Sequence, residues 1–193
     1  MNSGPLVFLG LLVAMACSWV TFVMSPQLQI GRLTPATNLV TQEFYPNAYE
    51  GEAGQGAQVY RANGCVACHT QQIRANDFGP DKAMFSAIRQ STAWDYLYDQ
   101  PVQLGDQRLG PDLASVGLRM DRAALLQKLY NPRQTAPGSV MPSYSYLFDK
   151  NGQPSPRAEQ LVSYLLSRRQ NIFIYFAPPP LTNKPAAAAA QKK

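Results

Sequence analysis

The cysteine and histidine side chains of this chain are concentrated in one five-residue stretch, Cys65-Val66-Ala67-Cys68-His69. His69 is the only histidine among 193 residues, and Cys65 and Cys68 are two of the three cysteines. Two thiols three positions apart, followed at once by a histidine, form the attachment pattern of c-type haem, in which the sulfurs become thioethers and the imidazole ligates iron. The sequence therefore predicts one covalent haem c per chain, held by Cys65 and Cys68 and ligated by His69.

Three other uses of these residues account for the pattern less well. A structural zinc ion needs four ligands, and the stretch supplies three with no second Cys/His pair elsewhere. A thioredoxin-like dithiol belongs in alternating strands and helices, whereas the flanking residues are helical and turn-like. A plain disulfide leaves the adjacent histidine unexplained.

The N-terminus predicts a single transmembrane helix. Residues 5–24 are a 20-residue apolar run, and the first charged side chain is Arg32. At about 1.5 Å per residue such a helix spans about 30 Å, the thickness of a bilayer core. We expect an anchor over 1–25 that ends at Ser25-Pro26. A cleaved signal peptide and a lipid attachment at Cys17 are the alternatives, and the apolar residues that continue past Cys17 disfavour both.

The elements that must position the haem motif are predicted to be helices. An extended linker over 26–50 carries aromatic residues that should lie against the protein. A helix from Gly51 to the stop at Asn63-Gly64 leads into the motif. Its glycines indicate either close packing against another helix or fraying.

Two later helices have local start and stop signals. Asp121 is the expected N-cap of a helix over 122–130, which Asn131-Pro132 stops, with Leu125, Leu126, Leu129 and Tyr130 on one side. Ser155-Pro156 begins another, which buries Leu161, Val162, Leu165 and Leu166 and ends near Arg168-Arg169, where cations suit the helix dipole. The fold class is thus mainly α, with a haem domain over 51–177 and a low-complexity, disordered tail over 178–193.

A haem-ligating histidine needs an acceptor for its second ring nitrogen. The turn over 108–113, marked by Gly110-Pro111, offers the Pro111 carbonyl, and Leu113 could cover one face of the haem. A plain surface turn is equally compatible with these residues.

Because the chain has one histidine, the sixth iron ligand must be a methionine, a lysine, a tyrosine, water or a neutral gas. Three methionines lie outside the N-terminal span, at positions 84, 120 and 141. Met141 is favoured, since its flanking loop residues Pro137 and Pro142 fix an extended backbone that can present the thioether. Met84 and Met120 remain alternatives. His/Met ligation raises the reduction potential and leaves no open site, which favours an electron carrier.

The net charge of +5 and the pI near 9.2 do not indicate nucleic-acid binding. The basic residues are spread along the chain, and the densest pairs, Arg168-Arg169 and Lys192-Lys193, lie near its end. No nucleic-acid partner is expected.

Several segments together resemble the membrane-anchored monohaem subunit (subunit II) of cbb-type cytochrome c oxidases, the C-family haem-copper oxidases. The attachment motif is common to all c-type cytochromes, whereas the segment from Tyr98 to Gly117 is much more specific. The resemblance rests on residues 64–74, 98–105, 108–117, 131–133 and 137–144.

The resemblance implies a role for each matching residue. Cys65 and Cys68 hold the haem, His69 and Met141 ligate iron, Pro111 supports the histidine, and Arg108 or Arg133 reaches a propionate. It also implies a cytochrome-c-like domain with a family insertion over 75–107. The chain departs from better-known members, which carry His, Phe and Trp at the positions of Gln100, Val102 and Leu104.

The resemblance further implies a function and a location. The chain would be an electron carrier and not itself an enzyme. It would take electrons from another c-type cytochrome subunit or a soluble donor and pass them to a haem-copper subunit that reduces oxygen. It would lie in the bacterial inner membrane as a single-pass protein, with the haem domain on the periplasmic side, where covalent haem is attached. A subunit of another complex, such as a nitric oxide reductase, and a haem-based gas sensor are the alternatives.

Overall fold

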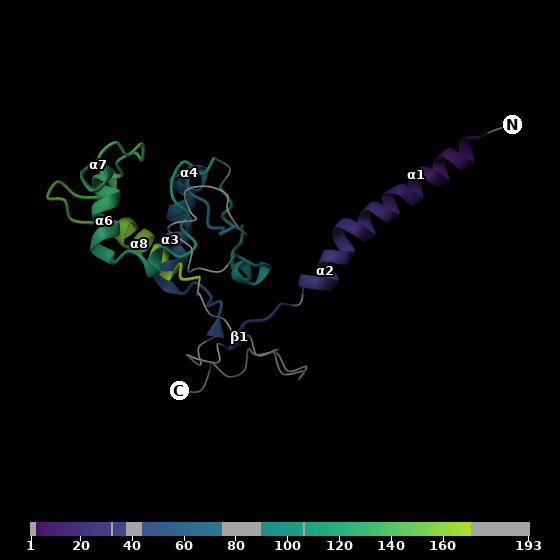
Figure 1. Ribbon diagram of the computed structural model, residues 1–193, viewed down its shortest axis with the longest axis horizontal. Helices are drawn as coiled ribbons and strands as arrows, with labels where there is room; N and C mark the ends of the chain where they lie inside the picture. The colour runs from purple at the N-terminus through teal and green to yellow at the C-terminus, as the bar shows by residue number, and fades with distance from the viewer. Residues whose placement is uncertain (1–2, 32, 38–43, 75–89, 106, 171–193) are drawn as a thin grey trace. The chain divides into compact units, whose positions relative to one another are not determined.

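The computed structural model describes residues 3–31, 33–37, 44–74, 90–105 and 107–170. Its described part is mainly helical, as predicted, and divides into two units, residues 1–35 and 36–193 (Figure 1). The predicted disordered tail over 178–193, the end of the predicted haem domain and residues 75–89 of the predicted insertion lie outside the described residues.

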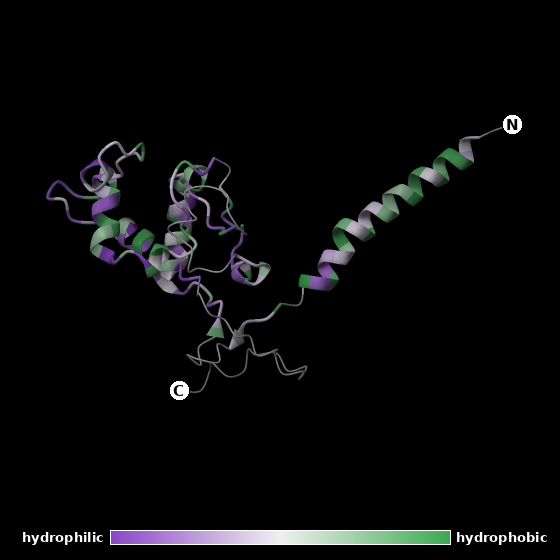
Figure 2. Ribbon diagram, in the orientation of Figure 1, coloured by the Kyte–Doolittle hydropathy of each residue, from purple (hydrophilic) through white to green (hydrophobic). Residues whose placement is uncertain are grey.

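The first unit is one helix that is long and apolar enough to cross a membrane. It comprises α1 (Gly4–Trp19), a π-helical turn η1 (Val20–Met24) and α2 (Ser25–Ile30). Together they make 27 residues, and none of them is buried within the protein. Figure 2 shows hydrophobic residues along most of this helix. An apolar helix without protein cover is what a bilayer anchor requires.

The helix does not end at Pro26, and this part of the prediction was wrong. In a regular α-helix the proline lacks a donor and its ring clashes with the carbonyl four residues earlier. Here the wider turn of η1 comes just before it, and the Ser25 N–H bonds to the Val20 carbonyl, five residues back. Such a turn accommodates a proline within a helix. The helix therefore runs to Ile30, five residues beyond the predicted anchor boundary.

The second unit begins with a small hairpin that the sequence did not predict. Strand β1 (Ala36–Thr37) pairs antiparallel with β2 (Phe44–Tyr45), with Ala36 opposite Tyr45. The Tyr45 hydroxyl donates to Asp95, and the Tyr49 hydroxyl donates to Asp99 at 2.5 Å. The later part of the predicted linker thus lies on the helical domain, as its aromatic residues indicated.

The core of this unit forms where α3 (Gly51–Ala62) packs against α8 (Pro156–Ser167). A Cβ atom at Gly56 would lie 1.9 Å from the Gln160 carbonyl oxygen, so only glycine fits the contact. Of the two interpretations of these glycines, close packing against another helix therefore holds at Gly56. The buried side chains that the two helices contribute are Ala57, Val59, Tyr60, Ala158, Leu161, Val162, Tyr164 and Leu165.

The two helices with local signals begin and end as predicted. In α6 (Arg122–Tyr130) the Asp121 carboxylate accepts from the Ala124 N–H at 2.8 Å. In α8 the Ser155 hydroxyl caps the Ala158 N–H. Three of the predicted inward residues are less covered than expected, because Tyr130 is exposed and Leu126 and Leu166 are only half-buried. The remaining short elements among the described residues are α4 (Cys65–Cys68), η2 (Ala93–Tyr96), η3 (Val116–Leu118), α7 (Pro132–Thr135) and η4 (Ser145–Leu147).

A buried ion pair lies at the C-terminal end of α8. Arg168, expected to act at the helix dipole, instead donates to Asp99 at 3.2 Å, with 8% and 3% of the two side chains exposed. Burial lowers the pKa of Arg168 to about 10. The same Asp99 oxygen accepts from Tyr49. Three segments distant in sequence are thus joined through one carboxylate.

Substituting Gly56 tests the helix contact. We expect Gly56→Ala to destabilise the protein by about 1–3 kcal/mol, because α3 and α8 must separate to admit the methyl group. Thermal and denaturant unfolding of the full chain in mild detergent, followed by circular dichroism, measures the loss. Gly54→Ala is the matched control in the same helix. Its Cβ would lie 3.3 Å from the Tyr49 carbonyl oxygen, and a change below about 1 kcal/mol is expected. Equal losses would contradict the proposed contact.

Candidate haem site

The motif lies on a one-turn helix that brings its side chains together. Gly64 precedes α4 with φ of +66°, a left-handed conformation that favours glycine, and so turns the chain out of α3 into the motif. Cys65 is buried and Cys68 half-buried, and both are free thiols. Burial raises the pKa of Cys65 to about 11. The thiol form therefore predominates at neutral pH.

The His69 ring is held by the turn that the sequence singled out. Its Nδ1 atom lies 2.9 Å from the Pro111 carbonyl oxygen and donates to it. Gly110 lies against the ring, since a Cβ atom there would be 2.2 Å from Cε1. Burial lowers the pKa of His69, and the hydrogen bond to Pro111 opposes this shift. The imidazole is thus neutral, with Nε2 left for a metal, the form in which histidine ligates iron.

The segment after the motif is hydrogen-bonded to residues that lie more than 30 positions later in the chain. No helix or strand is assigned to residues 69–74, so their backbone groups pair with other parts of the chain. This pairing places the 103–113 segment across the motif. The bonds run from Gly110 N to Cys68 O (2.9 Å), Leu113 N to Thr70 O (2.9 Å), Gln71 N to Gln103 O (3.0 Å) and Gln72 N to Asp112 Oδ2 (2.9 Å).

Asp112 is a site-supporting residue that the sequence analysis missed. Its side chain is 1% exposed, and its two oxygens accept from the backbone N–H groups of Gln72 and Ala114. It thereby connects the segment that carries His69 to the turn that carries Pro111. Its position directly after Gly110-Pro111 was the only local signal, and that position does not predict which distant residues the carboxylate binds.

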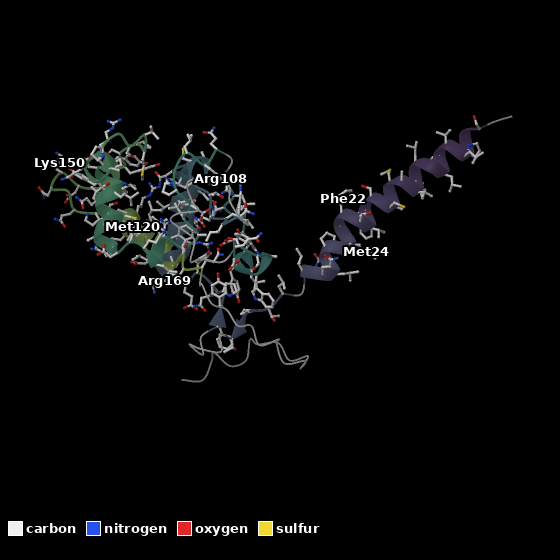
Figure 3. All side chains as sticks on the ribbon, in the orientation of Figure 1. Phe22, Met24, Arg108, Met120, Lys150 and Arg169 are labelled. Carbon is white, nitrogen blue, oxygen red and sulfur yellow. The ribbon has the colours of Figure 1, made fainter. Side chains whose placement is uncertain are left out.

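The structure brings two of the three candidate methionines to the core. Met141 and Met120 are both half-buried and pack against the cluster that contains Cys65. Figure 3 labels Met120 near the start of α6. The Met141 loop is tied to α6, because Tyr144 N donates to Leu129 O at 2.9 Å. Met84 lies outside the described residues.

The remaining predicted residues differ in their surroundings. Leu113 is half-buried against the same core cluster, while Arg133 is exposed on α7. Arg108 adopts a left-handed backbone with φ of 47° and donates from Nη2 to Gln72 Oε1 at 3.2 Å. Its Nε is buried, and no described atom accepts a hydrogen bond from it. This cation thus has a donor available for a further anionic partner.

These residues fit a c-type haem. The two free thiols lie one helical turn apart and suit the vinyl groups of the haem. The neutral histidine has Nε2 available for the iron, and the Arg108 guanidinium has a donor available for a propionate. A helical domain with such a turn and such a histidine has the architecture of the cytochrome c class.

Comparison with protein families makes the assignment specific. Residues 5–166 match the family described as cytochrome c oxidase, mono-heme subunit, FixO. The chain belongs to this family, which supports its identification as the monohaem subunit of a cbb-type oxidase. The family implies one haem and a haem-copper catalytic partner. No curated protein matches the chain.

Removing one thiol tests the attachment site. We expect Cys68→Ser to leave little covalent haem, because only one thioether can then form. Haem staining of the full chain on a denaturing gel measures the remainder. Cys17→Ser, at an exposed position of α1, is the matched control and should stain as strongly as the wild type. Normal staining of Cys68→Ser would sink the attachment model.

Proposed function

We propose that this chain relays electrons through one covalent haem c to the haem-copper subunit of a cbb-type oxidase, where oxygen is reduced to water. The observation that carries the proposal is the neutral, oriented His69 at the end of a turn with two free thiols. The donor is another c-type cytochrome, as a further subunit or a soluble protein. The isolated chain is an electron carrier without an enzymatic activity of its own.

Four residues perform the central tasks in this proposal. Cys65 and Cys68 would hold the haem as thioethers, and His69 Nε2 and Met141 would be the ligands of its iron. The bound haem supplies a one-electron couple whose potential depends on these ligands and their hydrogen bonds. The Pro111 carbonyl keeps the His69 ring in its orientation and in the Nδ1–H tautomer.

Peripheral residues assist in holding the group. Arg108 is well suited to a propionate because its Nε is buried without a partner among the described atoms. Arg133 would be a second cation for this role, and Leu113 would contribute apolar cover to the haem.

The proposed location is the bacterial inner membrane. The helix from Gly4 to Ile30 crosses the bilayer once, and the haem domain lies on the periplasmic side. This side is required because bacteria attach haem to Cys-x-x-Cys-His motifs outside the cytoplasm. The lipid bilayer is thus itself a partner of the chain.

Purification in mild detergent tests the complex. We expect an affinity-tagged chain to bring down a copper-containing haem subunit and cytochrome c oxidase activity. Metal analysis, haem spectra and peptide identification of the copurifying subunits provide the measurement. Recovery with a copper-free nitric oxide reductase core would contradict the oxidase assignment and leave the electron-relay role standing.

Replacing the proposed sixth ligand tests the relay against gas sensing. We expect Met141→Leu to lower the midpoint potential and to open iron to carbon monoxide, because a thioether stabilises the ferrous state. Redox titration and reduced spectra with and without carbon monoxide measure both effects. Met120→Leu is the control and should match the wild type. If Met120→Leu lowers the potential and Met141→Leu does not, Met120 is the ligand. A large immediate shift of the wild-type spectrum with carbon monoxide would favour a gas sensor.

A further inference from the structure

Three fully buried polar side chains meet behind the haem motif, where α3 packs against α8. Tyr60, Gln71 and Tyr164 are exposed by 1%, 0% and 1%. We refer to them as the tyrosine–glutamine cluster. The two tyrosine rings contact each other with centroids 5.5 Å apart. The cluster joins both core helices to the segment that follows His69.

The hydroxyl groups of the cluster bind the segment that carries His69. Tyr60 donates to the backbone carbonyl of His69 at 3.1 Å. Tyr164 donates to Oε1 of Gln71, two residues further along, at 3.0 Å. Each core helix therefore contributes one hydrogen bond to this segment.

Packing alone does not explain these hydroxyls. Phenylalanine would fill the same space, and a buried hydroxyl destabilises the folded protein unless it is hydrogen-bonded. The segment that receives the bonds has no helix or strand of its own. Its orientation relative to the core helices therefore depends on side-chain bonds of this kind.

His69 is thus restrained at two separate points. Pro111 and Gly110 restrain the ring, and Tyr60 restrains the backbone from which the ring projects. We propose that Tyr60, supported by Gln71 and Tyr164, is a positioning residue that sets the orientation of His69 and thereby the reduction potential of the haem. This inference rests on the proposed function, because it requires His69 to ligate haem iron.

The expected direction follows from electrostatics. The Tyr60 O–H places the positive end of its dipole at the His69 carbonyl. Without it the negative end of that carbonyl is unbalanced in a buried environment, which stabilises ferric over ferrous iron. The same loss frees the backbone, so the orientation of the imidazole plane changes as well.

Tyr60→Phe in the full chain, purified with its complex, tests the inference. We expect a normal covalent haem content, a midpoint potential shifted to lower values and altered ferric g-values in electron paramagnetic resonance. Tyr49→Phe is the matched control, because it also removes a hydroxyl from a buried network, at Asp99, without touching the His69 segment. It should leave the potential and the g-values at their wild-type values.

If Tyr60→Phe accumulates poorly, the potential and g-values of Tyr164→Phe provide a second test. This second variant breaks the cluster one contact further from His69, so a smaller shift in the same direction is expected, and the double variant should shift less than the sum. A potential and g-values equal to wild type in either accumulating variant, with only a loss of unfolding stability, would overturn the inference. Failure of the proposed function is distinguishable, because it would appear in the wild type itself, as missing covalent haem, as an immediate carbon monoxide shift or as copurification without a copper-containing oxidase subunit.

Discussion

The hydrogen bond between the His69 ring and the Pro111 carbonyl is the contact on which the site depends. It joins residues 42 positions apart at 2.9 Å, and Gly110 lies close against the same ring. A histidine without this support could rotate about both side-chain torsions and present either nitrogen. With it, one tautomer and one orientation remain. The backbone bonds between the 68–72 and 103–113 segments, together with the buried Asp112, keep the carbonyl in place.

The helix pair α3 and α8 extends this restraint into the core. Glycine at position 56 lets the two backbones touch, and the tyrosine–glutamine cluster then reaches from both helices to the His69 segment. The Asp99–Arg168 pair closes the same region at the end of α8. In the proposed electron relay, rigid surroundings of His69 would lower the reorganisation energy of each electron transfer.

Elements whose signals are local were predicted correctly. Asp121 and Ser155 cap the N–H groups three residues ahead of them, so a few residues of sequence suffice to recognise the starts of α6 and α8. The helix stop at Pro26 was predicted from an equally local rule and was wrong. A change to five-residue bonding in the preceding turn accommodated the ring, and no single residue type announces that change.

By itself the sequence determined which potential ligating groups this protein has and how they are spaced, because the two thiols, the adjacent histidine and the apolar N-terminal run can be recognised in the chain without its fold. Only the tertiary structure decided which carbonyl holds the histidine ring in place, which glycine lets a second helix pack closely and which hydroxyls reach the His69 segment. Asp112, Tyr60 and Tyr164 carry no motif that names their partners. Their roles arise from contacts between segments far apart in sequence, and such contacts exist only once the chain has packed.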